Sequence, residues 1–154
     1  MSCSCSTSAT DYAAQICLGP FVTGDQWDGR QFTVWVNNPN FNPALARTDT
    51  NQAPGTGSNP RLISASNAYA DLERVVLQVH TSETQLDTLV DLDSDDAEIT
   101  INDAEDWVFT IGAYTFTLAA GSYFVAIACK ITSAGWKTFF KGTLTLTGKG
   151  VLPT

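Results

Sequence analysis

Charged residues are scarce in this sequence, and positively charged ones are the scarcest. The 154 residues contain 8 Lys and Arg against 16 Asp and Glu, which gives a formal net charge of −8. Nucleic-acid-binding proteins need basic residues to contact phosphates, so we predict no nucleic-acid partner. No apolar run approaches the roughly 20 residues that span a bilayer, so we also predict no membrane partner.

A secretory signal is also missing at the start of the chain. The first ten residues, MSCSCSTSAT, are polar and lack the basic-then-apolar order of such a signal. We therefore expect the chain to fold in a cytoplasm.

Catalytic patterns are absent as well. The single histidine, His80, falls on the opposite strand face from Val75, Leu77 and Val79, which suits a surface or interface position. An activated nucleophile needs a base that is itself held by an acid. The sequence contains no G-x-S-x-G, P-loop or G-x-G-x-x-G motif. We predict that the protein is not an enzyme and that it needs no cofactor.

The four cysteines are poorly spaced for a zinc site. Cys3, Cys5, Cys17 and Cys129 do not form the paired C-x₂₋₄-C spacing of zinc sites. Cys129 shares a strand face with apolar residues, so we expect it to be buried. Cys3 and Cys5 lie on a polar arm, where either could form a disulfide between subunits or with Cys17 of an adjacent copy. Both could equally be idle thiols.

What the sequence does contain is a strong period-two pattern from Leu118 to Thr147. Such alternation is typical of strands with one buried face. Ser133-Ala134-Gly135 supplies a turn between two strands. Phe139 breaks the alternation, which indicates either a bulge or an exposed ring. The predicted inward residues are Tyr123, Val125, Ile127, Cys129 and Ile131 before the turn, and Trp136, Phe140, Leu144 and Leu146 after it.

Further strand patterns precede this hairpin. We predict strands at Gln31 to Asn37, Asp71 to His80 and Leu86 to Leu92, with shorter ones around Ile99, Trp107 to Ile111 and Tyr114 to Leu118. About eight strands with turns at short intervals predict an all-β sandwich or barrel.

The chain length fits one domain with an extension. We assign residues 1–19 to an extended N-terminal arm and 20–154 to a β-sandwich domain, although Asp11 to Cys17 also fits a first edge segment or a helical turn. Residues 38–60 form a long polar loop rich in Pro, Gly and Asn. Loops of this length are usually functional or disordered, so a docking loop and a solvated insertion are both open.

An acidic run spaced D-x-D-x-D begins at Asp91. Hard cations such as calcium favour several oxygen ligands. An EF-hand loop would have glycine at its sixth position and glutamate at its twelfth, where this chain has Asp96 and Asn102. A solvated loop is therefore the better interpretation, with calcium kept open. The run comprises Asp91, Asp93, Asp95, Asp96 and Glu98.

Aromatic residues supply the remaining candidates for contact with partners. By its phase Trp107 belongs to the core, whereas Trp35 faces away from Phe32, Val34 and Val36. Aromatic side chains dominate interfaces as well as cores. We therefore predict interface residues at Cys3, Cys5, Cys17, Trp35, Phe41 and Phe139. Exposed tryptophans can instead stack on sugars.

The terminal hairpin also resembles a known family. Its "leu–small–Gly–x–Tyr" start and "phe–x–Gly–x–leu–x–leu–Thr" end are similar to the immunoglobulin-like domain at the N-terminus of tailed-phage baseplate upper proteins and related virion adaptors. The residues that carry this resemblance are Leu118, Gly121, Tyr123, Phe140, Gly142, Leu144, Leu146 and Thr147.

The resemblance implies an immunoglobulin-like antiparallel β-sandwich from a bacteriophage virion assembled in the host cytoplasm. It implies an adaptor or decoration subunit that docks on a symmetric assembly, at a baseplate, neck, fibre attachment or head surface. The expected partners are other virion proteins and copies of the chain itself. The alternative is a carbohydrate-binding or receptor-binding module.

Overall fold

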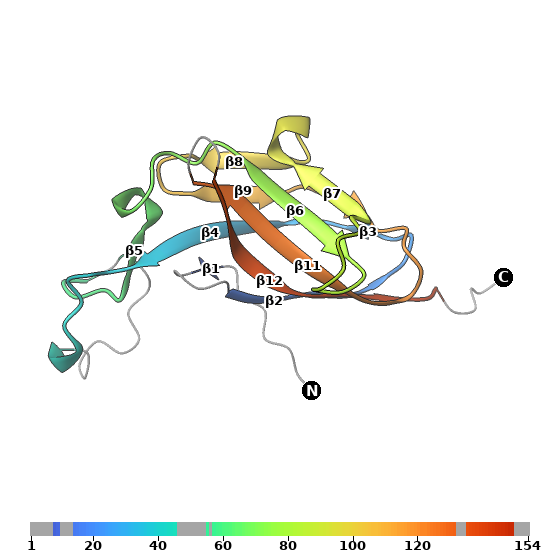
Figure 1. Cartoon of the computed structure of the whole chain (residues 1–154), viewed down its shortest axis with the longest axis horizontal. Helices are drawn as coiled ribbons and strands as arrows, with labels where there is room; N and C mark the ends of the chain where they lie inside the picture. The colour runs from blue at the N-terminus through green and yellow to red at the C-terminus, as the bar shows by residue number, and fades with distance from the viewer. Residues whose placement is uncertain (1–7, 10–13, 46–54, 56, 132–134, 150–154) are drawn as a thin grey trace.

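The computed structural model of the chain describes residues 8–9, 14–45, 55, 57–131 and 135–149 (Figure 1). Strands dominate this part of the chain, and its helices are single 3₁₀ turns. The strands are β1 (Ser8–Ala9), β2 (Ala14–Val22), β3 (Gln26–Trp27), β4 (Arg30–Asn37), β5 (Leu62–Ser64), β6 (Val75–His80), β7 (Val90–Asp93), β8 (Ile99–Asp103), β9 (Val108–Ile111), β10 (Tyr114–Thr115), β11 (Gly121–Lys130) and β12 (Trp136–Thr147). The 3₁₀ turns are η1 (Pro43–Leu45), η2 (Ala65–Asn67) and η3 (Ser94–Asp96).

Two sheets form the sandwich. The β4 sheet has the order β1-β4-β9-β8, with β5 also paired to β4, and the β11 sheet has the order β2-β12-β11-β6-β7. The β4-β9-β8 and β12-β11-β6 neighbours reproduce the B-E-D and G-F-C orders of immunoglobulin-like sandwiches. The predicted all-β sandwich is therefore confirmed. Two pairings depart from the antiparallel expectation, because β1 runs parallel to β4 and β2 runs parallel to β12.

Aromatic rings join the two sheets at the centre of the core. Phe32 on β4 stacks on Phe109 on β9, with ring centroids 5.6 Å apart. Phe140, from the opposite sheet, meets both rings edge-on at 5.1 and 6.4 Å. All three side chains are completely buried, and edge-to-face pairs add to the stabilisation from burial alone.

The strand faces follow the predicted alternation in most places. On β6, Val75, Leu77 and Val79 are fully buried, and on β11 the same holds for Val125, Ile127 and Cys129. On β4, Phe32, Val34 and Val36 point inward while Trp35 is half-buried on the outer face. The period-two pattern therefore identified the core sides of these strands correctly.

The Tyr123 side chain is hydrogen-bonded to the turn that precedes β11. Its hydroxyl donates a hydrogen bond to the carbonyl oxygen of Ala119 at 2.6 Å. A tyrosine that bonds back across the turn before this strand is a recurring feature of immunoglobulin-like sandwiches. Antibody domains place a disulfide-bonded cysteine two residues later, whereas this chain has the buried Val125.

A β-bulge at Phe139 overturns three expectations. Ile127 pairs with Phe140 and Ala128 pairs with Thr138, so Phe139 is the extra residue on β12. Phe139 and Phe140 are both fully buried, so the exposed-ring alternative and the interface role predicted for Phe139 are wrong. An extra residue reverses the faces of a strand. Trp136, predicted to point inward, therefore lies on the outer face with 43% of its surface exposed.

The predicted strand from Leu86 to Leu92 is wrong in its first half. β7 begins at Val90, and Leu86 is 96% exposed. The carboxylate of Asp87 accepts hydrogen bonds from the backbone N–H and the hydroxyl of Thr81. These bonds close a loop after β6, which keeps the residues before Leu89 out of the sheet.

The boundary of the predicted N-terminal arm also shifts. We assigned residues 1–19 to the arm, but β2 occupies Ala14–Val22 at the edge of the β11 sheet. Ile16 and Leu18 are buried there, and the pairing with β12 accounts for their alternation with Gln15 and Cys17. Most of the residues ahead of β2, and residues 132–134 of the predicted turn, lie outside the described residues.

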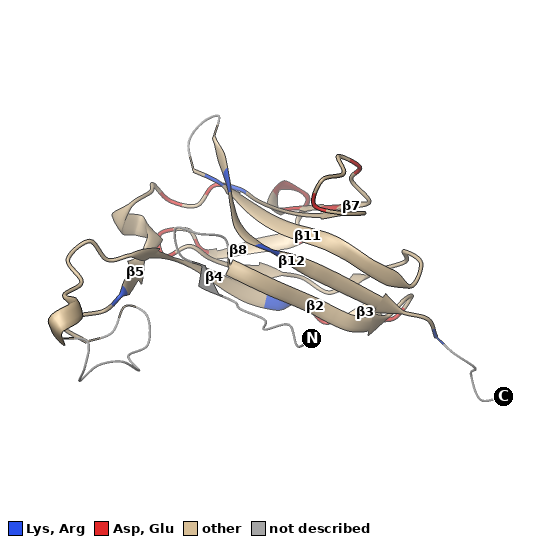
Figure 2. Cartoon of the chain, turned by 60° about the horizontal axis from the view of Figure 1, so that its bottom comes forward, with Lys and Arg blue, Asp and Glu red and all other residues tan. Residues whose placement is uncertain are grey.

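The long loop forms a projection beyond one end of the sandwich. We define the projection as residues 38–45 and 57–61, which leave β4 and return to β5 at the end of the molecule opposite Thr147 (Figures 1 and 2). Asn38 Nδ2 donates to the Pro60 carbonyl at 2.8 Å, and Asn59 exchanges two hydrogen bonds with the backbone of Asn42 at 2.8 and 2.9 Å. These asparagines join its two limbs.

The Tyr123 hydrogen bond can be tested by removing one oxygen atom. We expect Tyr123→Phe to lower the free energy of unfolding by roughly 0.5–1.5 kcal/mol, the usual net value of one hydrogen bond. Thermal denaturation would measure the loss. Tyr114→Phe is the matched control, because the Tyr114 hydroxyl has no hydrogen bond within the described residues. Equal melting of the two variants would contradict this role.

Gly142 marks the place where β2 approaches β12 most closely. A Cβ atom on Gly142 would overlap the carbonyl oxygen of Ile16, whereas a Cβ on Gly148 would meet nothing within 4 Å. We expect Gly142→Ala to cost roughly 1–3 kcal/mol of stability, a typical penalty for overpacking. Gly148→Ala should leave the denaturation midpoint unchanged. If Gly142→Ala melts like the wild type, β2 does not pack here as described.

Candidate binding surfaces

The predicted interface residues fall into three groups. Trp35 and Phe41 lie at the base of the projection and within it, whereas Phe139 belongs to the core. Cys17 lies on β2 and is disulfide-bonded. Cys3 and Cys5 also lie outside the described residues. Cys129 is free and buried, and burial raises the pKa of its thiol far above the ordinary range, which makes it unreactive.

Trp35 lines a hollow of about 450 Å³ on the outer face of the β4 sheet. The backbone of Gly55 lies against the indole ring, and the Gly55 N–H donates to the Leu62 carbonyl at 2.8 Å. At the rim, Ser64 Oγ donates to the Asp106 carboxylate at 3.1 Å. Thr33, Ile63, Asn67 and Val108 complete the lining. The hollow therefore adjoins the projection.

The projection presents apolar side chains without a core beneath them. The Arg61 guanidinium lies over the ring of Phe41, 5.0 Å from its centroid, and leaves Phe41 half-buried. Leu45 is 55% exposed. Asn59 is the only buried side chain among the described residues of the projection. Hydrogen bonds rather than apolar packing therefore hold this segment in shape.

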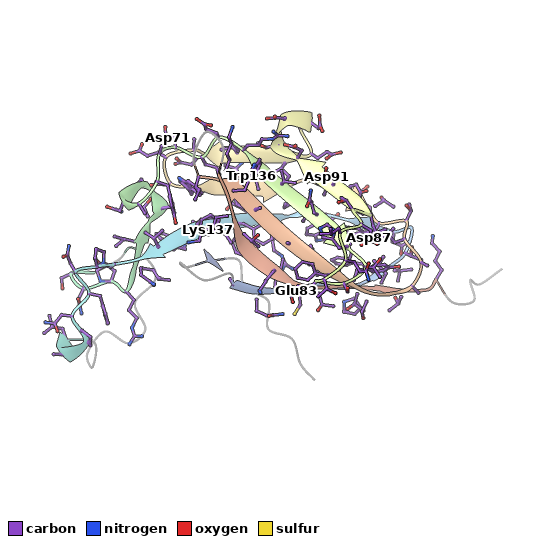
Figure 3. The ribbon with its side chains drawn as sticks, in the orientation of Figure 1. Asp71, Glu83, Asp87, Asp91, Trp136 and Lys137 are labelled. Carbon is purple, nitrogen blue, oxygen red and sulfur yellow. The ribbon has the colours of Figure 1, made fainter. Side chains whose placement is uncertain are left out.

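A second hollow, of about 390 Å³, lies on the outer face of the β11 sheet. Trp136 and Asp91 line it from either side of β6 and β11 (Figure 3). We call it the Trp136 hollow. Sequence analysis missed it, because the bulge at Phe139 reverses the face of Trp136 and no local signal shows where a bulge falls. The other lining residues are Arg74, Val76, Gln78, Asp93, Ala126, Ala128 and Thr138.

One ion pair organises the edge of this hollow. Arg74 Nη2 lies 2.5 Å from Asp93 Oδ2, and Arg74 Nε donates to Asp93 Oδ1 at 3.1 Å. The hydrogen bond from Arg74 holds the pKa of Asp93 below its usual range, against the opposing effect of burial. The guanidinium also lies 5.6 Å from the centre of the Trp136 ring, within reach of a cation–π contact.

The acidic run after Asp91 is a hydrogen-bonded turn. Asp93 caps η3 by accepting from the Asp95 N–H at 3.0 Å, and its own N–H donates to Glu98 at 3.1 Å. Arg74 Nε is also 3.2 Å from Asp95. Within the described residues, no three His, Cys, Asp or Glu side chains are grouped so that they could hold a metal ion. The preference for a solvated loop over a calcium site stays a prediction.

Negative charge is concentrated in one part of the molecule. Twelve of the sixteen acidic residues lie between positions 71 and 106, and Arg74 is the only Lys or Arg in that range. Figure 2 shows these carboxylates around β7 and the neighbouring loops. An anionic ligand would be repelled from this side of the sandwich.

His80 has a structural position at the far end of β6. Its Nδ1 atom contacts the carbonyl oxygen of Asp87, and its ring lies 6.3 Å from the ring of Phe124. The contact with Asp87 ties the same loop that the Asp87 carboxylate closes. His80 therefore acts here as a loop contact on the protein surface.

Comparisons with known proteins do not place the chain in a family. No protein-family model matches the chain, and no curated protein or solved structure matches it significantly. Among the described residues, no helix is long and apolar enough to cross a membrane. The described residues form an all-β sandwich with a hollow on the outer face of each of its two sheets.

The Arg74–Asp93 pair predicts a pH-dependent stability. The pKa of Asp93 is lower in the folded state, so its stabilising effect is complete above the unfolded pKa of about 3.9 and is lost as pH falls through the folded value. We expect Asp93→Asn to melt below the wild type at pH 7, with a gap that narrows below about pH 4. Thermal melting from pH 2.5 to 7 would measure it.

Asp91→Asn is the control for this measurement. Asp91 has no ion pair within the described residues, so its replacement should leave the melting temperature nearly unchanged at every pH. A gap for Asp93→Asn that stays constant down to pH 2.5 would show that the ion pair does not stabilise the fold.

Proposed function

We propose that this protein is a non-catalytic structural subunit that docks on other proteins of a larger assembly. The observation that carries the proposal is the projection, which extends from the end of β4 and presents the half-buried Phe41 and the exposed Leu45 (Figure 1). The projection and the Trp35 hollow, which β4 and β5 line, are the two parts of the proposed docking surface.

Ordering the projection without a partner costs conformational entropy that little apolar burial offsets. None of its described apolar side chains is buried, so it gains little hydrophobic stabilisation to offset the entropy of an ordered loop. A partner that covered Phe41 and Trp35 would supply that burial. Aromatic side chains in such positions are the usual anchors of protein interfaces.

The sequence of the terminal hairpin supports a more specific version of the proposal. Its similarity to the immunoglobulin-like domain of tailed-phage baseplate upper proteins suggests that the assembly is a bacteriophage virion built in the host cytoplasm. In that setting the partners are other virion proteins and further copies of this chain. The net charge of −8 is consistent with a role that involves no nucleic acid.

A covalent link between subunits remains part of this proposal. Cys17 is already disulfide-bonded, so a bond between copies would have to use Cys3 or Cys5. Non-reducing electrophoresis of purified particles would show such a bond as a heavier band that collapses on reduction.

Incorporation into particles tests the docking role. In a host strain that produces the particles without this gene, supplied Phe41→Asp protein should be incorporated at least about tenfold less than wild type. That loss corresponds to an interface anchor worth about 1.4 kcal/mol. Quantitative mass spectrometry of purified particles would measure the copy number.

The control is Leu86→Asp, which changes a side chain that is 96% exposed on the β6–β7 loop. Both variants should melt like the wild type, because neither position belongs to the core. Equal incorporation of both would show that the projection is not the docking surface. Particles that never contain the wild-type chain would contradict the virion assignment.

A further inference from the structure

We infer that the Trp136 hollow binds a neutral oligosaccharide. The hollow lies on the β11 sheet, and the proposed docking surface belongs to the β4 sheet and the projection. Binding in the hollow is therefore separate from docking. The inference rests on the shape of the hollow, on its aromatic wall and on the polar groups at its rim.

Small side chains shape the floor. In the register of the sheet, Ala128 lies between Val76 on β6 and Thr138 on β12, and Ala126 lies beside Gln78. Two alanines on the central strand leave a trough between the taller side chains on either side. Trp136 and Asp91 come from β12 and β7, which are three strand spacings, or about 14 Å, apart. The trough therefore suits an elongated ligand.

The aromatic wall is held in place before any ligand arrives. Arg74 lies against the Trp136 ring and is itself fixed by its two hydrogen bonds to Asp93. The indole still exposes 43% of its surface. An exposed ring that is already oriented loses little freedom on binding, which favours stacking against the C–H face of a sugar ring.

The rim offers hydrogen-bonding groups that are not used elsewhere. Within the described part of the chain, the side chains of Gln78, Asp91 and Thr138 have no hydrogen-bond partner. A carboxylate, an amide and a hydroxyl can between them accept from and donate to the hydroxyl groups of a sugar. An apolar floor with a few polar groups at its edge is the usual composition of a ligand site.

The charges around the hollow favour a neutral ligand. Asp91, Asp93 and the acidic segment around them repel anions. The nearby cations Arg74, Lys130 and Lys141 are already paired with carboxylates, at 2.5, 4.0 and 3.1 Å respectively. Of the two carboxylates among the described lining residues, Asp93 is paired with Arg74, which leaves Asp91 for a cationic ligand. Asp91 lies three strands away from Trp136. One basic side chain therefore could not form an ion pair with Asp91 and a cation–π contact with Trp136 at the same time.

A saccharide also fits this surface better than a peptide. The hollow is built on the face of a sheet whose backbone groups are engaged in their ladders, so a peptide lying over Ala126, Ala128 and Val76 would bury amide groups without partners. A sugar chain can place its C–H faces on this floor while its hydroxyl groups point to the rim and to solvent.

Titration with a defined panel tests the inference. The probes are cellohexaose, maltohexaose, mannohexaose and chitohexaose, with an octa-arginine peptide and a neutral Ser/Gly octapeptide for comparison. The ¹H–¹⁵N spectrum of the full chain should show saturable shifts of the Trp136 indole N–H and of the Ala126 and Ala128 amides with at least one hexasaccharide. The peptides should not produce them.

Four variants separate this site from the docking surface. Trp136→Ala should weaken binding roughly tenfold or more, and its melting temperature should remain close to that of the wild type because the ring lies on the surface. Trp35→Ala and Phe41→Asp should bind the sugar as the wild type does, even if Phe41→Asp fails to enter particles. Asp91→Asn should bind more weakly than these two controls.

Several results would overturn the inference. One is the absence of saturable shifts with all four hexasaccharides. Another is an equal loss of binding in Trp35→Ala and Trp136→Ala. Shifts at Ala126 and Ala128 caused by octa-arginine or the neutral peptide, but by no sugar, would assign the hollow to a protein partner instead.

Discussion

The contact of Phe140 with Phe32 and Phe109 is the interaction on which the sandwich depends. It joins the two sheets with three fully buried rings. The bulge at Phe139 is tied to this contact, because it lets two consecutive phenylalanines enter the core. The same bulge turns Trp136 outward, so core packing determines what the outer face presents.

The two exposed tryptophan surfaces differ in how they are supported. Trp136 lies on a continuous sheet, against an arginine that is itself held by an ion pair. Trp35 lies beneath Gly55 and beside a projection that is held by asparagine hydrogen bonds. A trough on the face of a sheet suits a small ligand, and a projection beyond the sandwich suits a protein partner, so the two sheets can serve separate recognition tasks.

Sequence alone predicted the fold class and the buried faces of β4, β6 and β11, because regular alternation depends only on neighbouring residues. It failed where distant contacts decide the outcome. The face of the sheet on which Trp136 lies depends on the bulge that β12 forms opposite β11. The exposure of Leu86 depends on the hydrogen bonds between Asp87 and Thr81. The parallel pairing of β2 is equally non-local, and so is the Trp136 hollow, which four strands build together.

The parallel pairing of β2 with β12 also has a mechanical consequence. Ala14 pairs with Phe140 at one end of the ladder, and Val22 pairs with Thr147 at the other. Tension applied at Ala14 and at Thr147 would pull the strands along their length in opposite directions. All the ladder hydrogen bonds would then share the load in shear, instead of opening one after another as in a peeled hairpin. A domain with this geometry can transmit force between its two ends without unfolding at its first weak bond.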